Sequence, residues 1–186
     1  MIEPRALLDR LPRPALLAYG AAVAVFVADQ ITKAWVVGGI FPKACPGFVA
    51  HAGHPASYCS IEVLPIFSLS MVWNFGVSFG MLKADNDWMR WALVLFSLAV
   101  SAALGWWALK ADRTRLALSI GLIMGGALGN AIDRMRFGAV ADFLNFEKLF
   151  FPWVFNVADA AITVGVILLI LDSFLSDRGA TVGRDA

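Results

Sequence analysis

The sequence has few charged residues and few of the side chains that bind metal ions. Charged residues make up 16% of the chain, and 15 Lys and Arg nearly balance 14 Asp and Glu. This balance excludes the basic surface that nucleic-acid binding needs, so we expect no nucleic-acid partner. Two histidines and two cysteines are too few for a zinc ribbon, an iron–sulfur cluster or a disulfide-rich scaffold. We therefore expect no metal and no other cofactor.

Apolar residues dominate instead. They make up 60% of the 186 residues, and the mean hydropathy of +0.73 is typical of a membrane protein. A membrane-spanning helix needs about 20 mostly apolar residues, and four segments approach that length: residues 15–37, 88–109, 116–132 and 150–171. The predicted fold class is an all-α membrane protein, in which residues 1–186 form one integral membrane domain built as a four-helix transmembrane bundle.

Basic residues between the second and third spans set the expected orientation. Lys110, Arg113 and Arg115 lie close together in this short connection. Short loops rich in Lys and Arg stay on the cytoplasmic side of a membrane. With four spans, both termini then also face the cytoplasm, and residues 38–87 and 134–153 form connections on the outer side.

The long outer segment, residues 38–87, contains a pattern typical of a strand. Apolar and small polar residues alternate over residues 67–73, as expected for a strand with one buried face. We predict a small extracytoplasmic β-sheet between the first two spans, lying on the membrane surface. Cys45 and Cys59 belong to the same segment, and the sequence is equally compatible with a disulfide and with two separate thiols.

Polar residues inside the apolar spans converge at one depth. An ionised side chain at the centre of a membrane-spanning helix costs about 2.5 to 3.5 kcal/mol on insertion scales, so each one needs a partner or a function. In the orientation above, the first and third spans end on the outer side and the fourth begins there. The polar residues near those ends are Asp29, Lys33, Asn130, Asp133, Arg134, Asn156 and Asp159. Their shared depth predicts a functional site near the outer surface.

Two carboxylates near this depth can meet. Asp142 follows the third span and Asp159 lies just inside the fourth, and these spans are antiparallel neighbours joined on the outer side. Two carboxyl groups about 3 Å apart share a proton, so that one acts as a base and the other as an acid. Such a pair can activate water for attack on a peptide carbonyl without a metal or a covalent intermediate. We predict that Asp142 and Asp159 are the catalytic pair of an aspartic endopeptidase.

Other proteolytic arrangements have less support. The sequence lacks an HExxH motif, and its two histidines, His51 and His54, lie in the outer segment, where a surface position is expected. Ser78 has no histidine in a matching span, although spacing leaves open a Ser–Lys pair with Lys33 or Lys83. A zinc or serine mechanism is therefore disfavoured.

Two further classes are alternatives. A small proton- or cation-coupled transporter needs a polar path, but the second and fourth spans have almost no ionisable residue in their inner halves. A non-catalytic scaffold would use the polar cluster only for helix packing. Asp29 and Lys33 fit an i, i+4 ion pair, and Asp133 beside Arg134 fits either an ion pair or a substrate contact. Asp172, at the cytoplasmic end of the fourth span, is expected to be solvated, so that Asp172→Asn is tolerated.

Short motifs occur in order along the chain. They are Asp29–Lys33 (DQITK), Asn74–Gly80 (NFGVSFG), Gly129–Arg134 (GNAIDR) with Val140–Phe143 (VADF), and Phe155–Ala160 (FNVADA). They resemble the DxxxK, NxGxxFG, GNxxDR with VxDF, and FNxAD elements of the bacterial lipoprotein signal peptidases, the type II signal peptidases. The resemblance covers nearly the whole chain, although the segment between the first two motifs is longer than the family pattern.

The resemblance implies an intramembrane aspartic endopeptidase of the bacterial inner membrane, with a small outer β-cradle and an active site near the periplasmic side. It implies prolipoprotein substrates that are cut just before a diacylglyceryl-modified cysteine, membrane lipid as a partner, and inhibition by globomycin. By matching motifs, the implied catalytic residues are Asp142 and Asp159. The residues implied to shape the site, support the fold or bind substrate are Asn130, Asp133, Arg134, Asn156, Asp29, Lys33 and Asn74.

Overall fold

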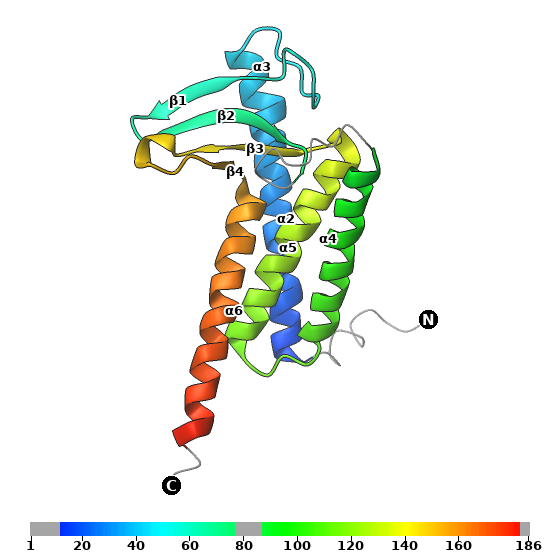
Figure 1. The fold of residues 1–186 in the computed structure, drawn as a ribbon, viewed down its shortest axis with the longest axis vertical. Coiled ribbons are helices and arrows are strands. Elements are labelled where there is room, and N and C mark those ends of the chain that lie inside the picture. Colours follow the sequence, from blue (N-terminus) through cyan, green and yellow to red (C-terminus); the bar gives the residue numbers. More distant parts are fainter. Residues whose placement is uncertain (1–11, 77–86, 183–186) are drawn as a thin grey trace.

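Four long helices and one small sheet make up the computed structural model, which describes residues 12–76 and 87–182. The long helices are α2 (Arg13–Trp35), α4 (Asp87–Ala108), α5 (Thr114–Phe137) and α6 (Val157–Val182). Each belongs to a helical segment long and apolar enough to cross a membrane. They run side by side as a bundle, with the sheet at one end (Figure 1). The predicted fold class is confirmed.

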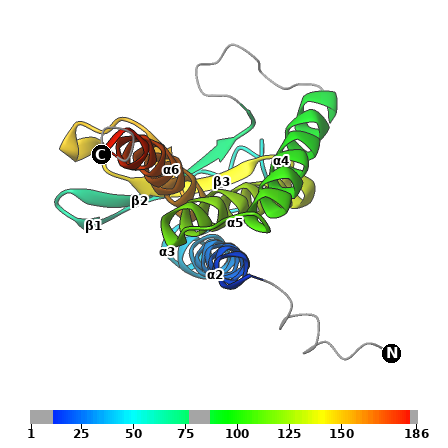
Figure 2. The same cartoon turned by 90° about the horizontal axis from the view of Figure 1, so that it is seen from below.

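Helix α5 lies at the centre of the bundle, between α2, α4 and α6 (Figures 1 and 2). Small residues allow this close packing. A Cβ at Gly125 would lie 2.5 Å from the carbonyl oxygen of Ala22 on α2. On its other side, a Cβ at Gly126 would lie 2.5 Å from the carbonyl oxygen of Ala158 on α6. A larger residue at either position would push a neighbouring helix away.

The sheet has four antiparallel strands in the order β1-β2-β3-β4. They are β1 (Ser60–Leu64), β2 (Phe67–Asn74), β3 (Val140–Asn145) and β4 (Val154–Phe155). The strand predicted over residues 67–73 is confirmed, and its pairing with β3 places Val72 opposite Asp142. Only β1 and β2 come from between the first two spans, whereas β3 and β4 come from the connection between α5 and α6. The sheet therefore joins two connections that are distant in sequence.

An apolar cluster seats the sheet on the C-terminal end of the first long helix. The helical chain continues past the predicted end of the span, through the π-helix η1 (Val36–Ile40) into α3 (Phe41–Ala44). Buried side chains of this extension and of the sheet region form one cluster; they are Val36, Val37, Phe41, Cys59, Leu69, Met71, Ala141 and Phe143. Because Phe143 follows Asp142 in β3, this cluster fixes the strand that carries a predicted acid.

A disulfide joins Cys45 to Cys59, which decides between the two alternatives that the sequence leaves open. Cys45 directly follows α3, and Cys59 directly precedes β1. The bridge therefore ties the end of the helical extension to the first strand of the sheet, and its Cys59 end is part of the buried cluster.

The fourth span begins later than the predicted range of 150–171. Helix α6 starts at Val157, and the residues before it form a turn and strand β4. Pro152 disfavours a continuous helix here, and Phe150 has a left-handed backbone with φ of 60°. Apolar composition alone does not separate a membrane-surface turn from the beginning of a span.

At the other end of the bundle, Asp172 on α6 is buried, and the expectation of a solvated carboxylate is wrong. Its side chain is 4% exposed and forms ion pairs with Arg113 at 3.2 Å and Arg115 at 3.3 Å. These arginines lie at the start of α5, so the ion pairs tie α5 to α6. Since Asp172→Asn would remove both ion pairs, its expected tolerance is no longer supported.

Removing the disulfide should lower the stability of the protein. Replacing Cys45 and Cys59 by alanine should lower the free energy of unfolding by about 3 kcal/mol, because the bridge constrains a loop of the unfolded chain across a sequence separation of 14. Thermal unfolding of detergent-purified protein measures this change. A reducing agent should destabilise the native chain similarly and leave the double variant unaffected; equal stability of the native chain and the double variant would contradict the prediction.

Candidate active site

A buried ion network lies where α2 meets α5. Lys33 Nζ is 2.8 Å from Asp29 Oδ2 and 2.8 Å from Asp133 Oδ2, and it donates to Asn130 Oδ1 at 3.3 Å. The Lys33 side chain is 4% exposed, and neither carboxylate exceeds 1%. The cation between two anions offsets the cost of burying charge, because each ion has an opposite partner. The ion pair predicted on α2 is confirmed, and Asp133 joins it.

The network reaches the backbone beside both predicted acids. Asp133 Oδ2 accepts the N–H of Ala141 at 3.1 Å, and Asp29 Oδ1 accepts the N–H of Ala158 at 3.0 Å. Ala141 and Ala158 each directly precede one of the predicted acids in the sequence. The carboxylates on α2 and α5 therefore hold the peptide units that place these acids on β3 and α6.

Gln30 belongs to this network, although it is not among the predicted site residues. Its Nε2 lies 3.2 Å from Asp29 Oδ2 and from Asp133 Oδ1, and 3.4 Å from the Gly129 carbonyl oxygen. Gly129 leaves room for the network, because a Cβ there would lie 2.5 Å from Asp29 Oδ2. A polar amide inside an apolar span is the sequence signal that could have identified Gln30.

Three asparagines hold the carboxyl groups of Asp142 and Asp159. Asn156 Nδ2 donates to Asp142 Oδ1 at 2.7 Å, and Asn130 Nδ2 donates to Asp159 Oδ1 at 2.8 Å. The two amides also contact each other, because Asn156 Nδ2 lies 3.2 Å from Asn130 Oδ1. Asn74, the last residue of β2, donates to Asp142 Oδ2 at 3.1 Å. The structure thus brings both predicted acids together with three of the predicted site-shaping residues.

The first turn of α6 orients Asp159. Asn156 Oδ1 accepts the backbone N–H of Asp159 at 2.9 Å, and Asp159 Oδ2 accepts the backbone N–H of Asn156 at 3.3 Å. These reciprocal hydrogen bonds form a capping box, which satisfies free N–H groups at the beginning of a helix. The same cap therefore starts the helix and fixes the direction of the Asp159 carboxylate.

Asp142 lies on β3, outside the membrane-spanning helices, and is 2% exposed. Burial and the nearby Asp159 carboxylate raise the pKa of Asp142 to about 8, against hydrogen bonds from Asn74 and Asn156 and the charge of Lys33, which favour ionisation. Asp142 is therefore mostly protonated at neutral pH. A protonated carboxyl group next to a second carboxylate is the arrangement expected of a proton-sharing pair.

Arg134 adds a positive charge near the acids. Its guanidinium interacts electrostatically with Asp159, Asp142 and Asp133. Its Nε is buried and has no hydrogen-bond partner within residues 12–76 and 87–182. Asp133 forms its ion pair with Lys33 on α2, which places Asp133 in the helix-joining network, whereas Arg134 Nη1 donates to the Asn130 carbonyl oxygen at 3.4 Å.

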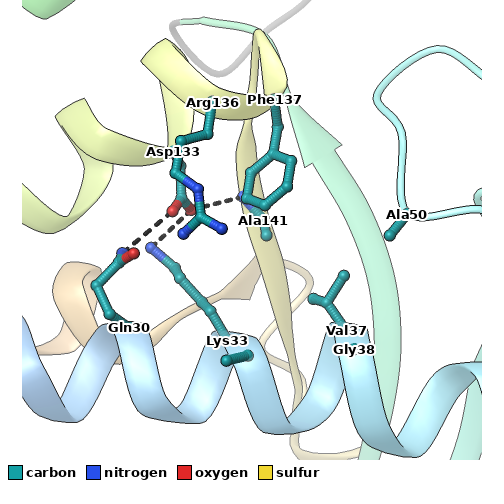
Figure 3. Close-up of a pocket in the computed structure, with 10 residues that line it drawn as sticks. Gln30, Lys33, Val37, Gly38, Ala50, Asp133, Arg136, Phe137 and Ala141 are labelled. Atoms are coloured by element: carbon teal, nitrogen blue, oxygen red, sulfur yellow. Dashed lines mark hydrogen bonds and ion pairs between the residues drawn. The ribbon is translucent and has the colours of Figure 1, made fainter.

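A cavity of about 270 Å³ borders the ion network, between α2, α5 and β3. Figure 3 shows Gln30 and Lys33 extending from α2 toward Asp133, with Arg136 beside them. Neither predicted acid lines this cavity. This cavity therefore opens to the ion network and is not the space in which the acids would meet a peptide.

The structure describes only some of the residues of the alternative mechanisms. Ser78 and Lys83, and with them the end of the NxGxxFG motif, lie outside the described residues. His51 and His54 are exposed, as expected. Among the residues that the structure describes, no group of three or more His, Cys, Asp or Glu side chains is arranged to hold a metal ion.

Known proteins resemble the chain in both sequence and fold. A family model described as signal peptidase (SPase) II matches residues 21–175. A lipoprotein signal peptidase of Caulobacter vibrioides is 46% identical over 169 residues, covering 90% of this chain and 92% of the relative. A lipoprotein signal peptidase of Methylobacterium is 39% identical over 174 residues, covering 92% of this chain and 98% of the relative.

Two solved structures, both described as bacterial membrane enzymes, share the fold. The first has a TM-score of 0.65 and 27% identity, and covers 87% of this chain and 88% of its own. The second has a TM-score of 0.63 and 26% identity, and covers 83% of this chain and 90% of its own.

The fold and these similarities define a bacterial multi-pass membrane enzyme of the peptidase class. More narrowly, the chain belongs to the signal peptidase II family, since the family model matches most of it and close relatives align over nearly their whole length. The resemblance seen in the short motifs is thereby confirmed.

Lys33→Met should strongly destabilise the protein. The change leaves Asp29 and Asp133 buried without their shared cation, and breaking a buried ion pair by removing one partner costs about 3 to 5 kcal/mol. Thermal unfolding in detergent measures the loss. Lys43→Met is the matched control, because Lys43 on α3 is exposed; similar stabilities of the two variants would show that the network does not hold the bundle together.

Proposed function

We propose that this protein removes the signal peptide from prolipoproteins by cutting just before a cysteine that carries a diacylglyceryl group. The names of the relatives, lipoprotein signal peptidases, support this class of substrate. The observation that carries the reaction type is the pair of Asp142 and Asp159, held by hydrogen bonds from Asn156 and Asn130. Membrane lipid is the second proposed partner, and globomycin is the proposed inhibitor.

The surroundings of the two acids support different roles. Asp159 lies at the N-terminus of α6, where the helix dipole and N–H donors from Asn156 and Asn130 suit a negatively charged carboxylate. Asp142 is mostly protonated at neutral pH, because its pKa is raised to about 8. We assign Asp159 as the general base and Asp142 as the general acid of the resting enzyme.

The proposed reaction proceeds in two steps. Asp159 takes a proton from water as the water oxygen attacks the scissile carbonyl carbon, and Asp142 donates its proton to the carbonyl oxygen. The resulting gem-diol then collapses: Asp159 gives its proton to the leaving nitrogen as the C–N bond breaks, and Asp142 takes a proton from one hydroxyl. Both acids return to their starting states, and neither a metal nor a covalent intermediate is needed.

The other predicted site residues are assigned positioning roles. Asp29, Lys33 and Asp133 hold the backbone beside the acids through the ion network, and Asn74 holds the Asp142 carboxyl group. Arg134 interacts electrostatically with both acids, so that its charge limits their mutual repulsion. Water can reach a site near the membrane surface, and a substrate helix must unwind there to expose its peptide bond.

The orientation follows from the ends of the bundle. The connection between α4 and α5 contains Lys110 and Arg113, with Arg115 in the first turn of α5, and it lies at the end of the bundle opposite the sheet (Figure 1). Basic connections face the cytoplasm. We therefore propose cytoplasmic termini in the inner membrane, with the sheet and the acid pair on the periplasmic side.

Asp142→Asn and Asp159→Asn should each abolish cleavage. An amide keeps the shape and some hydrogen bonds of the carboxyl group but can act neither as the base nor as the acid. We expect kcat to fall about 100- to 10,000-fold or more, measured with purified protein and a synthetic lipidated precursor, while thermal stability changes little. Asp112→Asn, at an exposed carboxylate between α4 and α5, is the matched control; turnover near the native rate in either site variant would rule out the pair.

The rate of cleavage should fall as pH rises through about 8. The mechanism needs one proton on the acid pair, and the raised pKa of Asp142 keeps that proton bound at neutral pH. Above this pKa Asp142 loses its proton, so the acid is lost and the rate declines. A pH profile of kcat/KM tests this, and a rate that stays constant through this range would contradict the assignment of Asp142 as the acid.

A chelator should leave the rate unchanged, because the two acids activate water without a metal. EDTA is added to the purified enzyme and the initial rate of precursor cleavage is measured before and after. Loss of activity that returns on addition of a divalent cation would favour a metal mechanism instead.

A further inference from the structure

The connection between β3 and β4, residues 147–153, forms a hairpin tip that exposes large apolar side chains. Phe150 is 99% exposed, and Leu149, Phe151 and Trp153 are also exposed. The tip lies at the end of the sheet remote from α4 (Figures 1 and 2). A Phe side chain so fully exposed is unfavourable in water, because burying apolar surface is what drives such residues inward.

Aromatic contacts hold the tip in place. The Phe151 ring centroid lies 5.2 Å from that of Trp153 and 5.6 Å from that of Phe155 on β4. Phe146, just before the tip, lies 5.9 Å from Phe155 and 4.9 Å from Phe67 on β2. The tip is therefore a packed structure that points Phe150 outward.

The backbone of the tip is also shaped to present this side chain. Phe150 has φ of 60°, a left-handed conformation that is costly for a bulky residue and that glycine or asparagine adopts more easily. It follows the 3₁₀ turn η2 (Glu147–Leu149). A phenylalanine at the one strained and exposed position of the tip indicates that the side chain has a partner outside the chain.

The position of the tip identifies that partner as the bilayer. Helix α6 starts at Val157, one residue after β4, and this membrane-spanning helix has exposed apolar residues such as Val164 and Ile167. The turn between β1 and β2 lies beside the tip and adds exposed Leu64 and Ile66. The apolar surface therefore continues from a membrane-spanning helix onto the end of the sheet, at the interface where aromatic side chains are enriched.

We propose that the hairpin tip inserts into the outer leaflet, with Phe150 at the boundary between headgroups and acyl chains. This lipid contact would act as a second anchor beside the four spans. The strand on one side of the tip carries Asp142, and β4 on the other side leads into the cap of α6. The anchor would thereby set the depth of both strands relative to the bilayer. The proposal goes beyond the proposed function and does not depend on it.

A fluorescent label tests the insertion without measuring catalysis. Leu149→Cys leaves Phe150 intact and supplies one free thiol, because both native cysteines form the disulfide. The full chain is labelled with NBD and placed in nanodiscs of phosphatidylethanolamine and phosphatidylglycerol. Some nanodiscs also contain a phosphatidylcholine with a nitroxide near the headgroup end of its acyl chain. His51→Cys, at an exposed position in the loop that precedes β1, is the matched control.

We expect the label at Leu149→Cys to show blue-shifted emission and to lose most of its fluorescence to the nitroxide lipid, while the label at His51→Cys keeps its fluorescence. Adding Phe150→Ser to the Leu149→Cys variant should reverse much of this loss, with size-exclusion chromatography confirming a folded, monodisperse protein. Equal, weak quenching at both positions would overturn the proposal. So would quenching that is indifferent to Phe150→Ser, or shielding that depends on protein concentration and instead indicates a second copy of the chain.

Discussion

The placement of Lys33 between Asp29 and Asp133 is the interaction on which the site depends. It joins α2 to α5 inside a membrane protein, where an unpaired charge is costly. Each carboxylate also accepts a backbone N–H, one from β3 and one from α6. Four elements are thus held by one cation and two anions, and the peptide units before both acids are fixed to the centre of the bundle.

Burial of the ion network and of Asp142 affects both the position of the acid and its charge. An apolar replacement for the network could be as stable, since buried ion pairs are weak contributors to stability when compared with good apolar packing. Apolar side chains, however, could not accept the N–H groups of Ala141 and Ala158 in fixed directions. The same burial, together with the nearby Asp159 carboxylate, raises the pKa of Asp142 to about 8, so that burial contributes both to the position of the acid and to the control of its charge.

The spacing of polar residues in apolar spans was sufficient to predict which polar side chains lie together, because charge inside a membrane is rare and needs a reason. Asp142, Asp159, Asn130 and Asn156 meet as that argument predicts. Features that depend on tertiary contacts could not be predicted from the sequence. Strand β3 pairs with β2 across a long stretch of sequence, and the arginines that bury Asp172 lie at the start of another helix. The cysteines meet only because the fold brings the end of α3 to the start of β1. The turn before α6 could not be separated from the span, because this loop and a span have similar apolar composition.

The long segment between α2 and α4 is part of the support of the site. Its helical extension and first two strands enclose the apolar cluster that contains Phe143, the neighbour of Asp142, and the disulfide closes that cluster at Cys59. Side chains alternate along a strand, so burying Phe143 on one face of β3 directs the Asp142 carboxyl group to the other. Contacts on the far side of the sheet therefore determine which way the acid points, while the ion network determines where its backbone lies.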